Sequence, residues 1–242
     1  MSTIVDYVEV QGNLVNTDIS FLQSQISLYI APNLQLQSSS VKTTITFQQP
    51  IVNLPNGQQL AVMFVSIQTP DNAGSQLTKV SFSNANNNVN LWYTIVSSGM
   101  SIKTQNTLTG LNFTIVQDFG SVPTNLYQIT VLSSGQPVQG ATVTANLIGS
   151  NNSTNSTSNS VRVFTTDSTG SVYIVTPSKF FSVSISAAGY VTQTQNITQP
   201  QTQITIAPTP LNTNNMLPII GVAVGGLLLL MMAGGGGGGG ED

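Results

Sequence analysis

The stretch LYQITVLSSGQPVQGATVTANL, from Leu126 to Leu147, carries the clearest fold signal in the sequence. Runs of apolar and β-branched residues flank Gly135-Gln136-Pro137, and glycine and proline so placed are typical of a turn between two strands. The positions after this turn that we expect to enter a hydrophobic core are Val138, Ala141, Val143 and Ala145. The stretch therefore predicts two consecutive strands joined by this turn.

Two further segments continue the predicted β-structure. The first is VRVFTTDSTGSVYIV, from Val161 to Val175. In its turn the side chain of Asp167 is expected to cap its own backbone, and Gly170 to supply a positive φ. The second is KFFSVSISAAGYVTQTQNIT, from Lys179 to Thr198, where Gly189-Tyr190 ends a strand and lays an aromatic ring across the sandwich.

These pieces together resemble the carboxypeptidase-regulatory-like (transthyretin-like) β-sandwich family. The matching motifs are Gly135–Val143, the turn Thr166–Gly170 and Ala188-Gly189-Tyr190, within residues 126–198. The resemblance implies a spacer or binding module that carries no catalytic residues. One departure is the long polar insertion GSNNSTNSTSNS at 149–160, where members of the family often have a tight hairpin.

The first 120 residues also show strand patterns with turn residues between them. Ile26, Leu28 and Ile30 lie at every second position, which predicts a strand. Asn56-Gly57 is a typical hairpin dipeptide, and it precedes Leu60–Ile67, which is apolar on both faces and predicts a central strand. No window has a helical period. This region is therefore predicted to be a second β-sandwich, of the jelly-roll or immunoglobulin-like type.

The C-terminal run MLPIIGVAVGGLLLLMMA, from Met216 to Ala233, has no charged side chain and is followed by seven glycines. A bilayer core needs about 20 apolar residues in a helix, so the run predicts a membrane-spanning helix. Gly221, Gly225 and Gly226 give this helix a face of small residues, which favours close packing of helices in a homo-oligomer. The alternative is that glycine is simply common in such helices.

The sequence thus predicts an all-β chain with one C-terminal transmembrane helix. The expected parts are an N-terminal jelly-roll or immunoglobulin-like sandwich at 1–120, a carboxypeptidase-regulatory-like sandwich at 126–207, a stalk at 208–215 and the transmembrane helix at 216–240.

Composition excludes several classes of function. Only 5% of residues are charged, the net charge is −3, and there is no Cys and no His. The five basic residues are scattered, so we expect no binding of nucleic acid. Disulfides, thiolates and the commonest zinc ligands are absent. Asp6 and Glu9 are close in sequence, but their odd spacing puts them on opposite faces of a strand. We therefore expect no enzyme, no cofactor, no metal site and no small-molecule substrate.

Several polar and aromatic residues are candidates for surface roles. Asn-x-Ser/Thr motifs mark surfaces outside a cell, although a chain rich in Asn, Ser and Thr also produces them by chance. Trp92 and Tyr93 form either a sugar-binding platform or, as we prefer, ordinary core and edge residues of a strand. The candidate N-glycosylation sites are Asn112, Asn151, Asn152, Asn155 and Asn196.

The function that fits these observations is structural rather than catalytic. The N-terminus lacks the basic and apolar regions of a signal peptide, so we expect the protein either to enter a membrane through its C-terminal helix or not to be exported by the standard route. We expect a protein of a membrane-containing virion, as in an archaeal virus: a component of a tail, nozzle, turret or spike. Its partners would be the lipid membrane, its own copies and other virion or envelope proteins. The alternative is a single-pass cell-surface glycoprotein or adhesin of an archaeal envelope.

Overall fold

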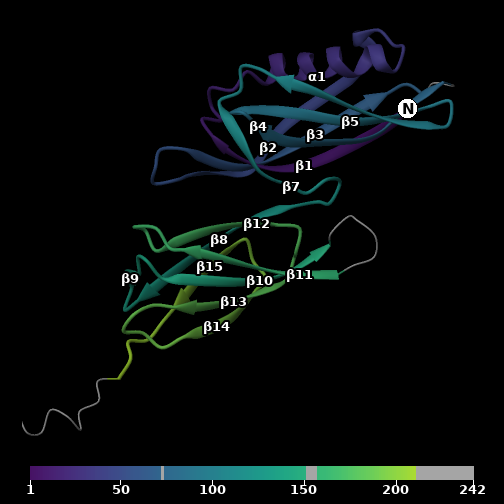
Figure 1. Cartoon of the computed structure of the whole chain (residues 1–242). Coiled ribbons are helices and arrows are strands. Elements are labelled where there is room, and N and C mark those ends of the chain that lie inside the picture. The colour runs from purple at the N-terminus through teal and green to yellow at the C-terminus, as the bar shows by residue number, and fades with distance from the viewer. Residues whose placement is uncertain (72–73, 151–156, 211–242) are drawn as a thin grey trace, which may run out of the picture. The chain divides into compact units, whose positions relative to one another are not determined.

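The computed structural model describes residues 1–71, 74–150 and 157–210 of the chain. Residues Met1–Ala207 form one compact unit, and Pro208–Asp242 a second. Within the described ranges the chain is mostly antiparallel β-structure, as the sequence predicts (Figure 1). None of the helices in these ranges is long and apolar enough to cross a membrane. The helix predicted at 216–240, with Gly221, Gly225 and Gly226, lies outside the described residues.

Two antiparallel sheets form the N-terminal part of the compact unit. The strands of the first sheet, in spatial order, are β2 (Lys42–Asn53), β3 (Gln59–Thr69), β1 (Ser2–Gly12) and β7 (Phe113–Asp118). Those of the second sheet are β4 (Ser75–Ala85), β5 (Asn88–Ser97) and β6 (Met100–Leu108). A single hydrophobic core, drawn from residues 4–115, lies on the inner faces of these sheets.

Local turn chemistry sets the connections between these strands. The Asn56-Gly57 hairpin is confirmed: Gly57 has φ +80°, and Asn56 Oδ1 accepts a hydrogen bond from the Gln58 N–H at 3.0 Å. Asn86 and Asn87 both have positive φ and form the two-residue turn between β4 and β5. Asparagine tolerates this conformation better than most residues, which is why an Asn-rich segment works as a loop tip here.

The strand predicted around Ile26 is wrong, because this region forms the helix α1 (Ile19–Asn33; Figure 1). Asp18 begins the helix, since its carboxylate accepts the Phe21 N–H at 2.9 Å. Ile26 and Ile30 are four positions apart, so they lie on one helical face and are fully buried, whereas Leu28 is 57% exposed. The all-β prediction is corrected to a mainly β fold with this helix packed into the first core and a short 3₁₀ turn, η1 (Ser38–Ser40).

The C-terminal part of the compact unit contains two further sheets. The strands of one, in spatial order, are β11 (Thr157–Thr165), β10 (Thr142–Ser150), β13 (Phe181–Ser186) and β14 (Gln193–Ile197). Those of the other are β12 (Ser171–Thr176), β8 (Asn125–Ser133) and β15 (Gln201–Thr205), with the short β9 (Gln136–Pro137) paired to β8. The β15–β8 pair is parallel, and the other pairs are antiparallel.

Two turns predicted from the sequence are confirmed in this second half. Ser134 and Gly135 both have positive φ in the tight turn between β8 and β9. Asp167 Oδ1 accepts hydrogen bonds from the N–H groups of Thr169 at 2.8 Å and Ser171 at 3.0 Å. Gly170 has φ +71°, and a Cβ there would lie 2.6 Å from the Val131 carbonyl oxygen, so only glycine fits. The core around these turns draws on residues 127–206.

Candidate functional site

The edges of the two N-terminal sheets are joined by side chains rather than by a backbone ladder. Asn84 on β4 accepts the Ile115 N–H at 2.9 Å with its Oδ1 and donates from its Nδ2 to the Ile115 carbonyl. Asp118, at the end of β7, accepts the Phe82 N–H of β4 at 2.6 Å and the Gly120 N–H at 2.7 Å. We call this line of contacts between β4 and β7 the seam.

Asp6 is buried on the inner face of β1, close to the seam. Its side chain is fully buried; one oxygen accepts the Tyr7 N–H at 3.1 Å, and the other has no hydrogen-bond partner. Burial, and after it the nearby Asp118 carboxylate, raise the pKa of Asp6 to about 9, against weaker opposing effects of the Tyr7 N–H and of Lys79. Asp6 is therefore protonated at neutral pH.

A third hydrophobic cluster connects the two halves of the compact unit, and we call it the joint. Leu60 and Val62, on the outer face of β3, are buried together with Leu126 of β8 and Val175 of β12. Partly buried side chains extend the joint: Tyr7, Val52, Leu54, Phe119 and Tyr173. Part of the face of the first sheet that points away from its own core is thus covered by residues of the second half.

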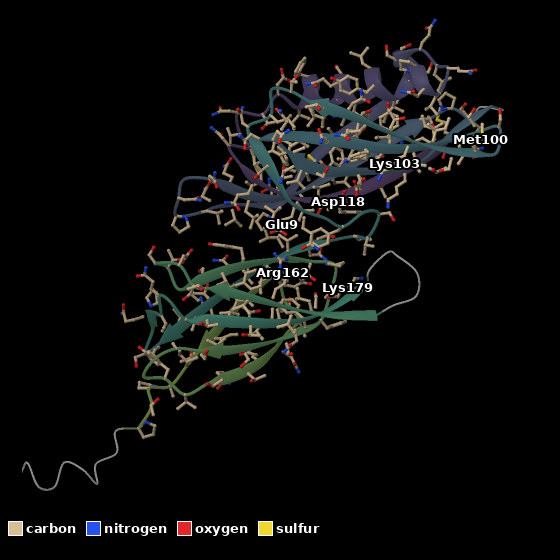
Figure 2. The ribbon with its side chains drawn as sticks, viewed as in Figure 1. Glu9, Met100, Lys103, Asp118, Arg162 and Lys179 are labelled. Carbon is tan, nitrogen blue, oxygen red and sulfur yellow. The ribbon has the colours of Figure 1, made fainter. Side chains whose placement is uncertain are left out.

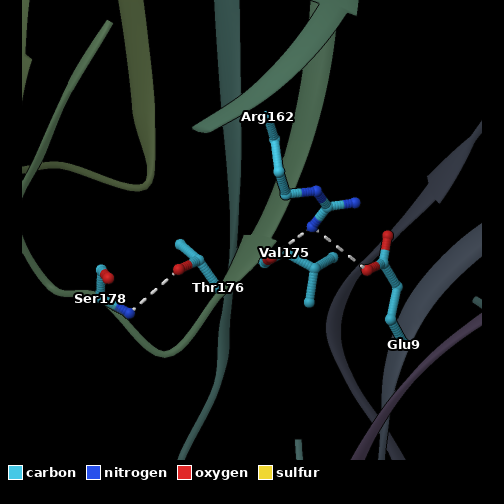
Figure 3. Close-up of polar contacts among 5 residues, drawn as sticks. All are labelled: Glu9, Arg162, Val175, Thr176 and Ser178. Carbon is cyan, nitrogen blue, oxygen red and sulfur yellow. Dashed lines mark hydrogen bonds and ion pairs between the residues drawn. The ribbon is translucent and has the colours of Figure 1, made fainter. Parts of the chain in front are cut away.

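Glu9 and Arg162 form an ion pair at the joint (Figure 3). Arg162 Nη1 lies 3.7 Å from Glu9 Oε2 and donates a hydrogen bond to the Val175 carbonyl at 3.1 Å. The Arg162 guanidinium also lies over the Phe164 ring, 5.1 Å from its centroid. Burial raises the pKa of Glu9 to about 7, although Arg162 acts in the opposite direction. The pair therefore carries full charge only above neutral pH.

A cleft of about 620 Å³ lies beside the seam and the joint. Its lining includes Lys79, Asp118 and Arg162, three of the residues already described (Figure 2 labels the last two). A carboxyl with a strongly raised pKa near a cleft is a general sign of an acid–base site. Here Asp6 has no exposed surface, and both oxygens of Asp118 already accept backbone N–H groups. The carboxyls are thus placed to hold the fold together rather than to meet a substrate.

The candidate glycosylation sites have different positions. Asn112 is exposed, and its Nδ2 donates to the Asn16 carbonyl at 3.0 Å. Asn196 is exposed on β14. Asn151, Asn152 and Asn155 lie outside the described residues. In the parts of the chain that the structure describes, no group of three or more acidic side chains is arranged to hold a metal ion.

Trp92 and Tyr93 separate to opposite faces of β5. Tyr93 is 1% exposed in the first core, where its hydroxyl accepts a hydrogen bond from Asn33 Nδ2 at 2.8 Å. Trp92 is half-buried on the outer face of the sheet, and its Nε1 donates to Ser83 Oγ at 3.0 Å. The expectation of a core residue is confirmed for Tyr93, and Trp92 is the residue left on a surface.

Sequence reasoning missed the residues that make the joint and the seam. Asp6 and Glu9 do lie on opposite faces of β1, as their spacing predicts, because Asp6 faces the first core and Glu9 faces the joint. Sequence spacing did not link Asp118 to Asp6, and the structure brings the two side chains together. A single arginine among apolar residues, Arg162, was the one available signal for a buried ion pair.

Comparisons with known proteins add little to this description. No protein-family model and no curated protein matches the sequence. The streptococcal ancillary pilin is 14% identical and has a TM-score of 0.26; the match covers 84% of this chain and 61% of the pilin. The group B streptococcus pilus 2b backbone protein is 11% identical, with a TM-score of 0.29 and coverages of 85% and 86%.

The major pilin subunit of Bacillus cereus is 8% identical and has a TM-score of 0.25, with 84% of this chain and 59% of the pilin covered. The chain thus spans about 61% of the streptococcal ancillary pilin and about 59% of the Bacillus pilin. Similarities of this size do not establish a shared fold, so the function proposed below rests on the residues of this chain alone.

Proposed function

We propose that this protein is a non-enzymatic structural component that displays a stiff β-rich body on a surface. The observation that carries the proposal is the joint. Domains linked only by a flexible connection move independently, whereas a buried apolar contact holds them in one arrangement. Leu60, Val62 and Val175 are each at most 5% exposed there, and the Glu9–Arg162 pair crosses the same contact.

We further propose that the surface faces an acidic medium. Two carboxyls, Asp6 and Glu9, are buried with raised pKa values, so their neutral forms suit the folded state. A chain with 5% charged residues relies on neutral amides and hydroxyls for its contacts with water. Those groups do not titrate, so the surface keeps its hydrogen bonding at a pH where carboxylates become protonated.

The finer assignment is a structural protein of a membrane-containing virion, such as an archaeal virus, as part of a tail, nozzle, turret or spike. The C-terminal apolar run Met216–Ala233 supports attachment to a lipid membrane, and the glycines at 221, 225 and 226 support a homo-oligomer through that helix. The resemblance of residues 126–198 to the carboxypeptidase-regulatory-like family supports the role of a spacer module.

Particle fractionation tests the assignment. Virus particles are separated from all host envelope on a density gradient, and the protein is quantified by mass spectrometry in particles and in envelopes of uninfected cells. We expect the protein in the particles, from which detergent releases it together with the membrane. Its absence from envelope-free particles would remove the virion assignment.

A second test addresses the oligomer. We expect the double variant Gly221→Leu, Gly225→Leu to lower the oligomer size in detergent, because leucine prevents close approach of the helices. The control is Leu227→Phe, which adds bulk at a position that 3.6 residues per turn place away from the three glycines. An unchanged oligomer in the double variant would remove the helix-packing proposal and leave the surface role intact.

The alternative function is a cell-surface glycoprotein or adhesin. The exposed side chains of Asn112 and Asn196 favour it, because both acceptors are open to modification. Mass spectrometry of protein from its native source distinguishes the two: glycans at both positions together with recovery from cell envelopes support the adhesin, and unmodified asparagines in purified particles support the virion protein.

A further inference from the structure

The outer face of the second sheet, formed by β4, β5 and β6, carries three rows of side chains. Lys79, Lys103, Gln105 and Thr107 in these rows are exposed, whereas Asn90 is buried. Residues directly opposite each other in an antiparallel sheet point to the same face. The inner positions Val80, Leu91 and Tyr93 are in the core, so the alternate positions lie on the outer face. The three rows, read from β4 to β6, are Lys79–Thr94–Lys103, Ser81–Trp92–Gln105 and Ser83–Asn90–Thr107.

The strands of this face carry basic residues and no acidic ones. The chain has five Lys and Arg residues in 242, and Lys79 and Lys103 stand on either side of Thr94 in one row. Strands β4, β5 and β6 contain no Asp or Glu, although the whole protein has a net charge of −3. Among the described residues, neither lysine forms an ion pair. Lys79 lies at the margin of the face, in the cleft that Asp118 also lines, so Lys103 is the exposed cation beside Trp92 that is open to an anionic ligand.

Trp92 stands at the middle of the three rows. Its indole is held by the Nε1 hydrogen bond to Ser83 Oγ at 3.0 Å. Lys103 Nζ lies 4.5 Å from the centroid of the ring, and the exposed Lys103 side chain, labelled in Figure 2, comes from β6. The Lys103 ammonium is attracted by the indole ring, but such contacts are weak at exposed sites. The ammonium can therefore leave the ring and pair with an anionic group of a ligand.

We propose that this face binds an anionic polysaccharide, with Trp92 as the stacking platform. Lys103 is the partner of a sulfate group, or of a carboxylate at a pH at which that group is ionised. The C–H face of a pyranose ring packs on an indole, while its hydroxyls both donate and accept hydrogen bonds. Gln105, Thr107 and Ser81 supply amide and hydroxyl groups of the matching kind around the ring. A nucleic acid would meet only two cations here, too few to offset the net negative charge.

The experiment uses Trp92 itself as the reporter. It is the single tryptophan of the chain, so a change of intrinsic fluorescence reports on this face. Purified protein is titrated with oligogalacturonate, with a sulfated galactan oligomer, with a neutral galactan oligomer and with single-stranded DNA. We expect a saturable change with the two anionic sugars and binding at least tenfold weaker with the neutral one. Comparing the affinities for oligogalacturonate and for the sulfated galactan oligomer shows whether the site prefers a carboxylate or a sulfate group.

Variants locate the binding by calorimetry. Trp92→Ala is expected to abolish it, and Lys103→Gln to weaken binding of the anionic sugars about five- to tenfold, with little effect on the neutral one. Gln105→Glu, an exposed change of nearly equal shape beside the indole, is expected to weaken anionic binding similarly by repulsion. The matched control is Lys179→Gln, which removes an exposed charge far along the chain and is expected to change nothing.

Each other outcome overturns the proposal. Absence of binding at millimolar sugar, equal affinity for the neutral sugar, or binding unchanged in Gln105→Glu would refute the anionic-sugar site. Tighter binding of single-stranded DNA would reassign the face to nucleic acid. A fluorescence change that depends on protein concentration without ligand would reassign it to contact between copies. None of these results bears on the proposed surface display, which depends on the joint.

Discussion

Replacing Asp6 with asparagine should change how the stability of this protein depends on pH. Asn keeps an oxygen for the Tyr7 N–H and cannot ionise, so it imitates the protonated carboxyl in shape and charge. The pKa of Asp6 is about 9 in the folded protein, whereas that of an ordinary Asp is 3.8. At pH values between 3.8 and about 9, the Asp6 carboxyl is therefore protonated in the folded state and ionised in the unfolded state.

The sign and size of the effect follow from this difference. Because the folded pKa is raised, the stabilisation is complete below the unfolded pKa and is lost as pH rises through the folded pKa. The free energy of unfolding should fall by about 1.4 kcal/mol for each pH unit between those limits, or by about 4 kcal/mol from pH 4 to pH 7. That is a large part of the total stability of an ordinary domain, about 5–15 kcal/mol.

The assay is urea denaturation followed by Trp92 fluorescence, for the wild type and Asp6→Asn at several pH values. We expect equal stability near pH 4 and an advantage of about 4 kcal/mol for Asp6→Asn at pH 7. The other carboxyls are common to both proteins, so the difference isolates Asp6. Glu9→Gln should show the same sign over a narrower window, from pH 4.5 to about 7. An advantage of Asp6→Asn that does not vary with pH would refute the reasoning.

Two further predictions concern the fold. Gly170→Ala should lower the free energy of unfolding by about 2–4 kcal/mol, because φ is +71° and the new Cβ would lie 2.6 Å from the Val131 carbonyl oxygen. The control Gly57→Ala, with φ +80° and open space around it, should lower it by only about 1 kcal/mol, and equal losses of the two variants in thermal unfolding would contradict this reasoning. Leu22→Ala should lower the free energy of unfolding by about 2–5 kcal/mol, because Leu22 is fully buried, and Leu28→Ala by less than about 0.5 kcal/mol, because Leu28 is 57% exposed. Similar losses for the two variants in denaturant unfolding would argue against the helix α1.

The helix α1 shows how a local pattern can support two structures. Ile26 and Ile30 are an even number of positions apart, so they fit one face of a strand, and they are four apart, so they also fit one face of a helix. Leu22 continues the helical series and was the signal that favours the helix. Leu28, which the strand prediction placed in the core, is exposed. Packing of the helix against the first core decided between the two.

The sequence by itself determined the features that depend on neighbours along the chain. The mainly β character comes from the abundance of Val, Ile and Thr in alternating runs. Gly170 and Asp167 define their turn because only glycine fits the positive φ beside Val131 and because the Asp carboxylate bonds groups two and four residues ahead. The burial of Tyr93 follows from its place among apolar alternate positions of β5.

Only the tertiary structure decided which distant side chains meet. Asp6 lies beside Asp118 because β1 pairs with β7, and Glu9 reaches Arg162 because the outer face of that same sheet is covered by the second half of the compact unit. Sequence spacing places a residue on a face of its own strand, but it does not say which strand is the neighbour or what covers the face. Those choices depend on contacts between segments far apart in the chain, and they set the burial that raises both pKa values.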